Sequence, residues 1–303
     1  MIPVDPELPN PVCPGDFWGS LSCGEDEVES QPDETDYIIA TDGLLARKSG
    51  EWAKRKHHYL NNYCGITTKG IRNKGLRLIY LDVMAGPGLC KIKESGEEFP
   101  GSPLVALSHE FAEYWFIESA PNLADALQGR LKGHAKADRI KVLREDWCDL
   151  ANSGRLRFGD RDLVVAFVDP TGISQVPMTA MMSLAANSRI DILMTIQHGL
   201  GVVWNAPQFF RCQNETALDR FLDWDGWRSE WRGKGPTEIG RLAIDHFGKR
   251  LETKGFISTR HISVPEARPL YRFTLFSRHK RGEDFWQKIL RLDEKGQRDF
   301  PGF

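Results

Sequence analysis

The stretch Arg77-Leu78-Ile79-Tyr80-Leu81-Asp82, followed by Val83-Met84-Ala85-Gly86-Pro87-Gly88, indicates the fold of this chain. The first six residues are mostly apolar on both faces, which is typical of a strand buried in a parallel sheet. The next six form a turn of small residues, where a ligand can approach the backbone closely. The residues of this stretch that we expect to contact a ligand are Asp82, Ala85, Gly86 and Gly88.

Strands and helices alternate after this stretch. Further strands are expected at 114–118, 140–143, 163–168 and 190–196, and helices at 51–63, 102–111, 122–132 and 178–186. This alternation predicts a mostly parallel sheet with right-handed crossovers. Residues 256–264 and 270–276 have the pattern of an antiparallel hairpin, and 91–101 of a loop. We therefore expect an α/β, Rossmann-like fold with a C-terminal antiparallel hairpin.

Charge is distributed unevenly along the chain. The 303 residues include 40 basic and 42 acidic side chains, but residues 1–36 hold ten acids, six prolines and no Lys or Arg. Such a segment buries too little apolar surface to offset its chain entropy, so we expect a disordered acidic tail. Residues 37–303 would then form the α/β domain, with a net charge of about +8. Basic clusters at 54–58 and 69–77 favour contact with nucleic-acid phosphates.

Composition argues against several protein classes. The apolar stretch 163–168 is far too short to span a bilayer, and residues 1–7 lack the basic and apolar parts of a secretory signal. We therefore expect a cytoplasmic protein without a membrane segment. The six cysteines lie ten or more residues apart, and none is paired with a histidine at ligand spacing. Free thiols and no metal site are expected.

The pattern around 205–250 is helical, and we expect a helical insertion there. Aromatic residues recur in it at helical spacing with arginines between them, at Phe221, Trp224, Trp227 and Trp231. Such a stripe is more typical of a core face, although aromatics interleaved with arginines also stack on nucleotides.

Acidic residues stand where the expected strands end. Asp82 ends the first strand and Glu118 the second, Asp146 follows the third, and Asp169 ends the fourth. In a parallel sheet, ligands bind at the carboxyl ends of the strands. A carboxylate at Glu118 suits ribose hydroxyls, and one at Asp146, which Trp147 follows, suits the exocyclic amine of adenine. Helix capping is the ordinary structural role of such acids.

This order of acids resembles the class I S-adenosylmethionine (SAM)-dependent methyltransferases, whose first motif is an acid before a glycine-rich turn. Ala85 stands here in place of the first glycine. The resemblance implies SAM as cofactor, bound by Asp82, Ala85, Gly86, Gly88, Glu118, Asp146 and Trp147. An NAD-binding sheet is the near alternative, but its acid lies about 20 residues after the glycines. No P-loop sequence is present.

Further motifs narrow the resemblance. They are Trp52 with Lys54 and Lys56, the turn 81–88, Gly101-Ser102-Pro103-Leu104, Phe116-Ile117-Glu118, the segment 167–172 and Ser277-Arg278-His279. In this order they resemble the three-Cys-motif partner protein family (TcmP), over about residues 42–292. The resemblance implies a partner protein, radical-SAM-like and with a three-cysteine motif, and a methyltransferase character.

The turn Asp169-Pro170-Thr171-Gly172 is the candidate acceptor end of the site. Methyltransferases of base amino groups carry an Asp/Asn-Pro-Pro-aromatic turn, and this chain lacks the second proline and the aromatic. Asp169 is the candidate catalytic residue, as a general base or as the group that orients the acceptor. The candidate substrate-binding residues are Pro170, Thr171, Gly172 and Lys56.

Three functions remain open on these grounds. The first is a SAM-dependent methyltransferase whose acceptor is nucleic acid or a nucleotide, which the basic domain favours. The second is a methyltransferase-like nucleic-acid or partner-binding module without turnover, favoured by Ala85 and the incomplete turn after Asp169. The third is a small-molecule methyltransferase, since a fold does not determine its substrate.

Overall fold

The computed structural model describes residues 36–72, 74–258, 262–264 and 271–291, so the expected tail lies outside the described residues except for Asp36. The strands are β1 (Tyr37–Ile39), β2 (Leu45–Ser49), β3 (Arg77–Asp82), β4 (Leu89–Ile92), β5 (Glu98–Pro100), β6 (Glu113–Ile117), β7 (Ile140–Leu143), β8 (Asp162–Val168), β9 (Ile190–Ile196), β10 (Ile257–Ser258), β11 (Ile262–Val264) and β12 (Tyr271–Ser277). The helices are α1 (Trp52–Gly70), α2 (Ser102–Leu107), α3 (Pro121–Leu131), α4 (Trp147–Asn152), α5 (Met178–Leu184), α6 (Ala206–Arg211), α7 (Ala217–Leu222), α8 (Trp227–Glu230), α9 (Pro236–Glu252) and α10 (Lys280–Ile289).

One large sheet organises the described residues. Its strand order is β10-β12-β9-β8-β3-β6-β7, and β11 also pairs with β12. Strands β9, β8, β3, β6 and β7 are parallel, whereas β12 is antiparallel to β9 and to both β10 and β11. The predicted Rossmann-like, mostly parallel sheet with C-terminal antiparallel strands is confirmed.

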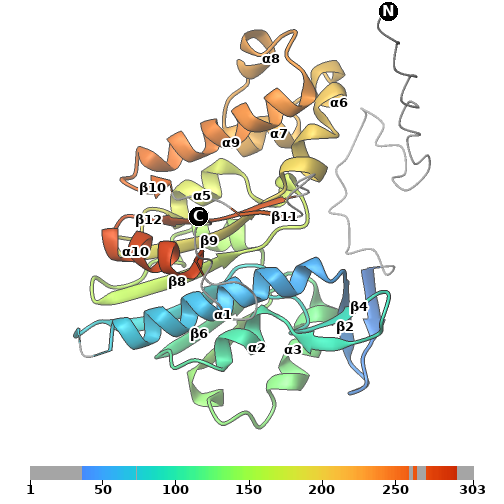
Figure 1. Cartoon of the computed structure of the whole chain (residues 1–303). Helices are drawn as coiled ribbons and strands as arrows, with labels where there is room; N and C mark the ends of the chain where they lie inside the picture. The colour runs from blue at the N-terminus through green and yellow to red at the C-terminus, as the bar shows by residue number, and fades with distance from the viewer. Residues whose placement is uncertain (1–35, 73, 259–261, 265–270, 292–303) are drawn as a thin grey trace, which may run out of the picture. The chain divides into compact units, whose positions relative to one another are not determined.

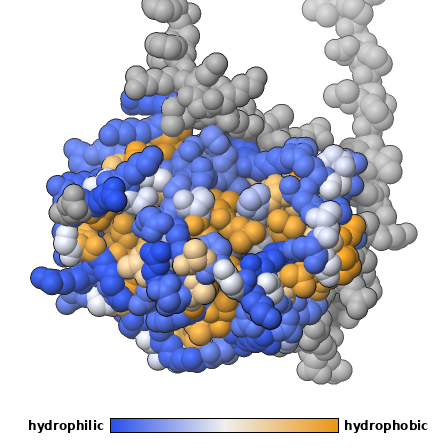
Figure 2. All heavy atoms as spheres, turned by 90° about the horizontal axis from the view of Figure 1, so that it is seen from below, coloured by the Kyte–Doolittle hydropathy of each residue, from blue (hydrophilic) through white to orange (hydrophobic). Residues whose placement is uncertain are grey.

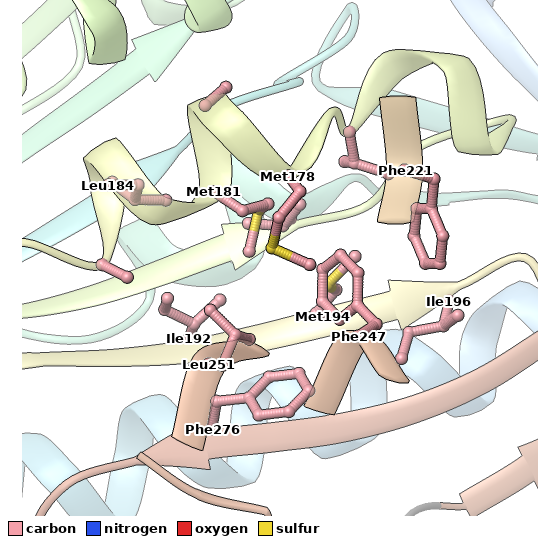
Figure 3. Packing of buried hydrophobic residues seen from close by; sticks show 14 of the residues in the cluster. Met178, Met181, Leu184, Ile192, Met194, Ile196, Phe221, Phe247, Leu251 and Phe276 are labelled. Carbon is pink, nitrogen blue, oxygen red and sulfur yellow. The ribbon is translucent and has the colours of Figure 1, made fainter. Parts of the chain in front are cut away.

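Helices cover both faces of this sheet (Figure 1). Helices α1, α2, α3 and α10 pack on one face, around the buried side chains of Tyr63, Phe116 and Trp286. Helices α4, α5, α7 and α9 pack on the other. Figure 3 shows that second core, in which methionines of α5 and β9 lie against Phe247 of α9. Strand β3 is buried from Leu78 to Asp82, as its continuous apolar pattern predicts.

The segment 206–252 folds as α6 to α9. Its aromatic stripe packs largely in the core: Phe221 and Trp227 are fully buried, and the ring of Phe221 stacks on that of Phe247 at 4.5 Å between centroids. Trp204, two residues before α6, is 63% exposed. No helix among the described residues is long and apolar enough to cross a membrane.

Helix α1 runs further than predicted, to Gly70 rather than to about Tyr63. Gly65 lies within the helix, and the Thr68 hydroxyl donates a hydrogen bond to the Cys64 carbonyl. Tertiary packing of α1 on α2 and α10 thus outweighs the low helix propensity of glycine. As a result α1 extends along the sheet from Lys56 at one edge to Lys69 near the other.

The expectation of a loop at 91–101 is wrong. Strands β4 and β5 form an antiparallel hairpin that joins β1 and β2 in a small sheet of order β1-β2-β4-β5. Short strands of this kind owe their stability to partners from elsewhere in the chain, here the parallel pairing of β2 with β4.

This hairpin is inserted between the glycine turn after β3 and helix α2. The Gly101 amide donates a hydrogen bond of 2.8 Å to the Gly88 carbonyl, so the chain returns to the point from which it left. The two backbones touch so closely that a Cβ atom at Gly101 would lie 2.9 Å from the carbonyl carbon and oxygen of Gly88. The contact therefore requires glycine at position 101.

Arg130 of α3 joins the small sheet to the glycine turn. One of its guanidinium nitrogens donates to the carbonyls of both Leu45 and Pro87, each at 2.6 Å, and the others bind Asp42. Its side chain is 5% exposed, so the link is screened from water. Strand β2 is thereby held at a fixed place beside the turn.

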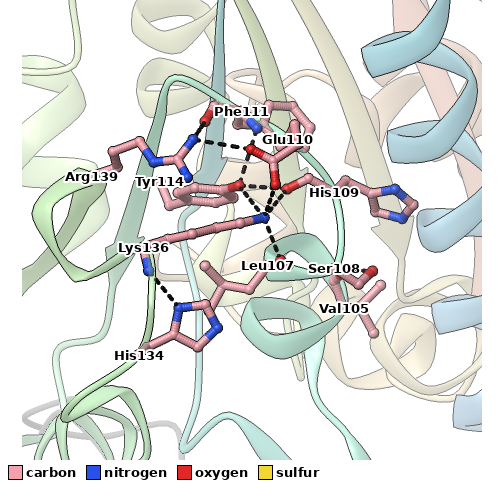
Figure 4. Close-up of polar contacts among 10 residues, drawn as sticks. All are labelled: Val105, Leu107, Ser108, His109, Glu110, Phe111, Tyr114, His134, Lys136 and Arg139. Atoms are coloured by element: carbon pink, nitrogen blue, oxygen red, sulfur yellow. Dashed lines mark hydrogen bonds and ion pairs between the residues drawn. The ribbon is translucent and has the colours of Figure 1, made fainter.

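The opposite edge of the sheet, at the amino ends of the strands, has its own polar network (Figure 4). The Lys136 ammonium donates to the carbonyls of Leu107 and His109 and pairs with Glu110 at 2.7 Å. It thereby gives a partner to the Leu107 carbonyl at the end of α2, and it shares the His109 carbonyl with the Tyr114 hydroxyl. Arg139 pairs with the same carboxylate.

Cysteine usage departs from the expectation at one position. Cys64, Cys90 and Cys148 are free thiols, but Cys212 is disulfide-bonded.

Gly101→Ala tests the backbone contact under the inserted hairpin. We expect the free energy of unfolding to fall by about 1–3 kcal/mol, because the new methyl group cannot displace backbone atoms as it could a side chain. Gly172→Ala is the control, since its Cβ atom would meet no atom closer than 3.8 Å and its φ of −151° is ordinary for alanine. Equal stability of the two variants in urea denaturation would contradict the account.

Candidate functional site

The carboxyl edge of the large sheet gathers the four predicted acids. Asp82 ends β3 and Asp169 follows β8, Glu118 follows β6, and Asp146 follows β7 and begins α4. The strands β7, β6, β3 and β8 are neighbours and parallel, so their carboxyl ends form one continuous edge. The structure therefore brings these four side chains to one side of the sheet, in the predicted order.

Asp82 lies at the centre of this edge and is fully buried. Burial raises its pKa to about 7, and the nearby Asp169 carboxylate adds to the effect. Its Oδ2 accepts a hydrogen bond from the Tyr80 hydroxyl at 3.3 Å. Its Oδ1 makes no hydrogen bond of normal geometry among the described residues, although the Ser102 hydroxyl is near enough to lower the pKa. An unsatisfied buried oxygen of this kind suits a cationic ligand.

The turn after Asp82 has the shape that its glycines predict. Gly86 and Gly88 have φ values of +62° and +85°, which favour glycine strongly. The Ala85 amide donates to the Ile117 carbonyl, and the Gly86 amide to Oε2 of Glu118 at 2.9 Å. A Cβ atom at Gly86 would meet nothing within 4 Å, so open space adjoins this residue.

Glu118 connects the turn to the start of α3. Its Oε1 accepts from the Ala120 amide and its Oε2 from the Gly86 amide, both at 2.9 Å. Burial raises its pKa, which these hydrogen bonds and the charge of Arg47 partly offset. Each oxygen keeps a second lone pair, so the carboxylate can bind backbone and ligand together.

Asp146 and Trp147 have clear structural roles. Oδ1 of Asp146 caps α4 by accepting from the amides of Cys148 and Asp149. The Trp147 indole is 3% exposed and donates to the Gln175 carbonyl at 2.9 Å. The cap occupies one oxygen of Asp146 and leaves Oδ2 for another partner, so the predicted contact with an adenine amine stays a prediction.

Asp169 forms the strongest ion pair of the edge. The Lys56 ammonium reaches its two oxygens at 2.6 and 2.5 Å, and the two side chains are only 8% and 14% exposed. Burial by itself would raise the pKa of Asp169, but Lys56 outweighs it and the net pKa lies below the ordinary value. Asp169 is therefore a carboxylate at neutral pH and a weak base.

The ammonium of Lys56 also lies between two aromatic rings. Its nitrogen is 5.6 Å from the ring centre of Trp52 and 5.3 Å from that of Tyr271, distances at which a cation is attracted to a ring face. The substrate candidate Lys56 and the catalytic candidate Asp169 thus lie together on the carboxyl edge. Trp52, which stands in one sequence motif with Lys56, and Tyr271, which the sequence analysis did not single out, flank them.

The remaining predicted substrate residues form a self-bonded turn. The Thr171 amide and hydroxyl both donate to the side-chain oxygen of Gln175, and the Pro170 carbonyl accepts from the Gln197 side chain at 2.7 Å. Gly172 is extended and precedes a short helical turn at Ile173. These contacts shape the loop after β8, and a contact with substrate stays a prediction.

Arg47 is not among the site residues predicted from the sequence. Arg47 lies on β2 of the small sheet, and its charge acts on both Glu118 and Asp169. His57, next to Lys56, is buried; burial lowers its pKa to about 4, so it is neutral. The basic pair Arg47-Lys48 is visible in the sequence, but the sequence does not show that the pairing of β2 with β4 places Arg47 beside this edge.

The residues at this edge fit SAM in chemical kind. Asp82 offers a buried oxygen to a cation, Glu118 offers lone pairs to hydroxyls, and the turn at Gly86 offers open space beside its backbone. Among the described residues, no group of three or more metal-ligating side chains occurs.

Lys56→Met tests the ion pair with Asp169. Removal of one partner leaves a buried carboxylate unpaired, and we expect a loss of about 3–5 kcal/mol in the free energy of unfolding at pH 7. The pKa of Asp169 then rises, so the loss should shrink as the pH falls and the carboxyl becomes neutral. Urea denaturation at pH 7 and pH 5 measures both effects.

Lys54→Met is the matched control, because Lys54 lies on the same helix and its ion pairs among the described residues are with the exposed Glu51 and Glu97. A small loss is expected there, and adding Asp169→Asn to Lys56→Met should restore much of the stability. Equal losses for both lysines, independent of pH, would refute the role of the pair.

Comparison with known proteins adds little beyond this geometry. No family model matches the chain, and no curated protein matches it in sequence. Among solved structures, it is similar to a Legionella pneumophila protein at 13% identity (78% of this chain, 88% of that one, TM-score 0.47). It is also similar to a putative methyltransferase, YhhF, of Escherichia coli at 14% (72% and 86%, TM-score 0.38).

A third structure is the magnesium protoporphyrin IX methyltransferase of Synechocystis with bound SAM, at 12% identity (75% and 82%, TM-score 0.40). Several of the solved structures that the chain is similar to are thus methyltransferases. At such scores the similarity carries no argument about this chain's activity, so a function for it has to be argued from its own residues.

Proposed function

We propose that this protein is a SAM-dependent methyltransferase whose acceptor is nucleic acid or a nucleotide. The proposal depends chiefly on one observation: four acids in a fixed order end adjacent parallel strands, beside a turn of glycines. Membership of the three-Cys-motif partner family, with its radical-SAM-like partner, rests on the sequence motifs alone and stays a prediction.

Each residue of the edge has a distinct part in this proposal. Asp82 holds the cationic end of the ligand, the turn with Ala85, Gly86 and Gly88 packs against it, and Glu118 binds the ribose hydroxyls. Asp146 accepts from the adenine amine through the oxygen that does not cap α4, and Trp147 supports that helix start. When bound, SAM supplies an electrophilic methyl group on sulfur.

Asp169 would act by position rather than by strong basicity. Its pKa is lowered beside Lys56, so it accepts a hydrogen bond from the acceptor and orients it but removes a proton weakly. Alignment of donor and acceptor supplies most of the rate in such a transfer. Pro170, Thr171 and Gly172 would border the acceptor, with Lys56 holding Asp169 in place.

The same ion pair favours a second candidate, a binding module without turnover. Both oxygens of Asp169 are engaged by Lys56, and this arrangement would suit a site that no longer transfers a methyl group. Binding of SAM without labelled methyl transfer to RNA or DNA would refute the nucleic-acid acceptor and favour this candidate or a small-molecule methyltransferase.

The nucleic-acid acceptor is supported by a hollow at the opposite, amino edge. It has a volume of about 950 Å³ and lies between the end of α1 and the loops before β3 and β8. Its rim carries exposed cations that make no ion pair among the described residues: Lys69, Arg72 and Arg161. Its acids, Glu110 and Asp162, are already paired with cations.

Helix geometry relates this hollow to the candidate site. Lys56 and Lys69 are 13 residues apart on α1, which spans about 20 Å at 1.5 Å per residue. A nucleic-acid strand covers that distance in roughly six nucleotides at 3.4 Å each. A strand held at the hollow could therefore reach Asp169. Seen from the side of α2 and α3, the surface shows apolar patches among hydrophilic side chains (Figure 2).

Calorimetric titration of SAM tests the proposed function. We expect micromolar binding that weakens at least tenfold in Asp82→Asn, because the buried oxygen then carries no charge. With a pKa of about 7, Asp82 is mostly protonated at pH 6, so native affinity should fall several-fold from pH 8 to pH 6. The isosteric Asn variant should lose this pH dependence. No binding by folded native protein would refute the proposal.

Arg72→Glu with Arg161→Glu tests the hollow. At 50 mM salt we expect at least a tenfold loss of affinity for a 20-nucleotide RNA or its DNA counterpart. The slope of log affinity against log salt concentration should become smaller by about two. Arg232→Glu with Lys249→Glu is the control, since these exposed cations lie just after α8 and on α9, outside the hollow. Fluorescence anisotropy measures both. Equal losses in the two double variants would contradict a docking role for the hollow.

A further inference from the structure

Arg47 lies on the inner face of the small sheet. It is in register with Cys90 on β4, and Cys90 is in register with Phe99 on β5. Residues in register on paired strands project to the same face, and Cys90 and Phe99 pack against Ala53 of α1. The Arg47 side chain therefore projects toward α1, on the side where Lys56 meets Asp169.

The backbone of Arg47 is held close to the glycine turn. Two residues before Arg47, the Leu45 carbonyl accepts a hydrogen bond from a guanidinium nitrogen of Arg130. The same nitrogen donates to the Pro87 carbonyl of the turn, and both distances are 2.6 Å. Cys90, beside Arg47, is only two residues after Gly88. Arg47 thus has a fixed position next to the turn at which the proposed ligand would bind.

The guanidinium of Arg47 makes no hydrogen bond or ion pair among the described residues, although the side chain is half-buried. Two neighbouring acids are engaged elsewhere, Asp169 with Lys56 and Glu118 with two backbone amides, and the exposed Asp36 acts on Arg47 through its charge without an ion pair among the described residues. Five N–H donors in a planar fork match the two oxygens of a carboxylate or a phosphate oxyanion. A half-buried cation without such a partner is costly, and an anionic ligand group would remove that cost.

The proposed ligand supplies one such group. Apart from its sulfonium and its amino group, the methionine end of SAM has a carboxylate, the only anionic group of the molecule. Asp82 offers negative charge on one side of the turn and Arg47 positive charge on the other, so the pair matches an amino acid end that carries both signs.

We propose that Arg47 binds the carboxylate of the methionine end of SAM and makes the site specific for ligands with that end. This inference rests on the proposed function, which it deepens. It assigns to the small sheet, and so to the hairpin inserted after Gly88, the task of completing the cofactor site.

Two ligands that differ only in this end separate the possibilities. S-adenosylhomocysteine carries the amino acid end, whereas 5′-deoxy-5′-methylthioadenosine keeps the adenosine and the sulfur without it. In Arg47→Gln we expect the Kd of the first to rise at least tenfold and that of the second to change less than twofold, by calorimetry at pH 7.5. Arg47→Lys should be intermediate, because it keeps the charge and loses the fork.

Lys48→Gln is the matched control, since it removes the same charge from the next residue of β2, whose side chain projects to the other face. It should leave both affinities unchanged. Equal weakening of both ligands in Arg47→Gln, or no weakening, would overturn the assignment of Arg47 and leave the proposed function standing. Failure of the native protein to bind either ligand would overturn both, and urea denaturation of each variant shows whether the fold is intact.

Discussion

Like charges at the carboxyl edge of one sheet are the constraint around which this molecule is built. Asp82 and Asp169 end neighbouring strands, and the charge of Asp169 opposes the ionisation of Asp82. Two cations lower the pKa of Asp169. Lys56 pairs with it at 2.5 Å, and Arg47 on the small sheet acts on it through its charge. Asp82 receives no cation of its own among the described residues. The charge of Asp169 is thus balanced by an ion pair, whereas Asp82 keeps a buried oxygen without a cation at hydrogen-bond distance in the described part of the chain, which suits the cationic group of the proposed ligand.

The inserted hairpin explains how that balance is reached. A direct passage from the glycine turn into α2 would leave no element over the edge, whereas the detour through β4 and β5 brings a small sheet beside it. The close contact of Gly88 and Gly101 closes the detour, and Arg130 fixes β2 to the turn. Packing at a glycine pair thus positions a charged side chain that comes from a strand much earlier in the chain.

Much of this arrangement could be predicted from the sequence, because the large sheet depends on local patterns. Strand β9 has the bounds that its pattern predicts, and six apolar-rich residues suffice to identify β3, since buried parallel strands are continuous apolar runs. The order of acids after the strands follows from the same patterns. The hairpin of β4 and β5 and the place of Arg47 could not be predicted, because these strands lie outside the alternation of strands and helices that identifies the equally short β6 and β7. They depend on partners distant in sequence. Asp146 and Trp147 illustrate a different limit: the sequence cannot distinguish a helix cap or a core indole from a ligand contact, and the structure shows the cap and the core contact.

Hydrogen exchange of the native protein with and without S-adenosylhomocysteine tests the central claim that the carboxyl edge is the ligand site. The account predicts slower exchange in the segments after the strands of that edge, 83–88, 118–120 and 145–149, and in β2, with exchange at the amino-edge segments 108–112 and 159–162 unchanged. Protection confined to the amino edge, or to the α6–α9 helices, would place the ligand elsewhere and contradict the account.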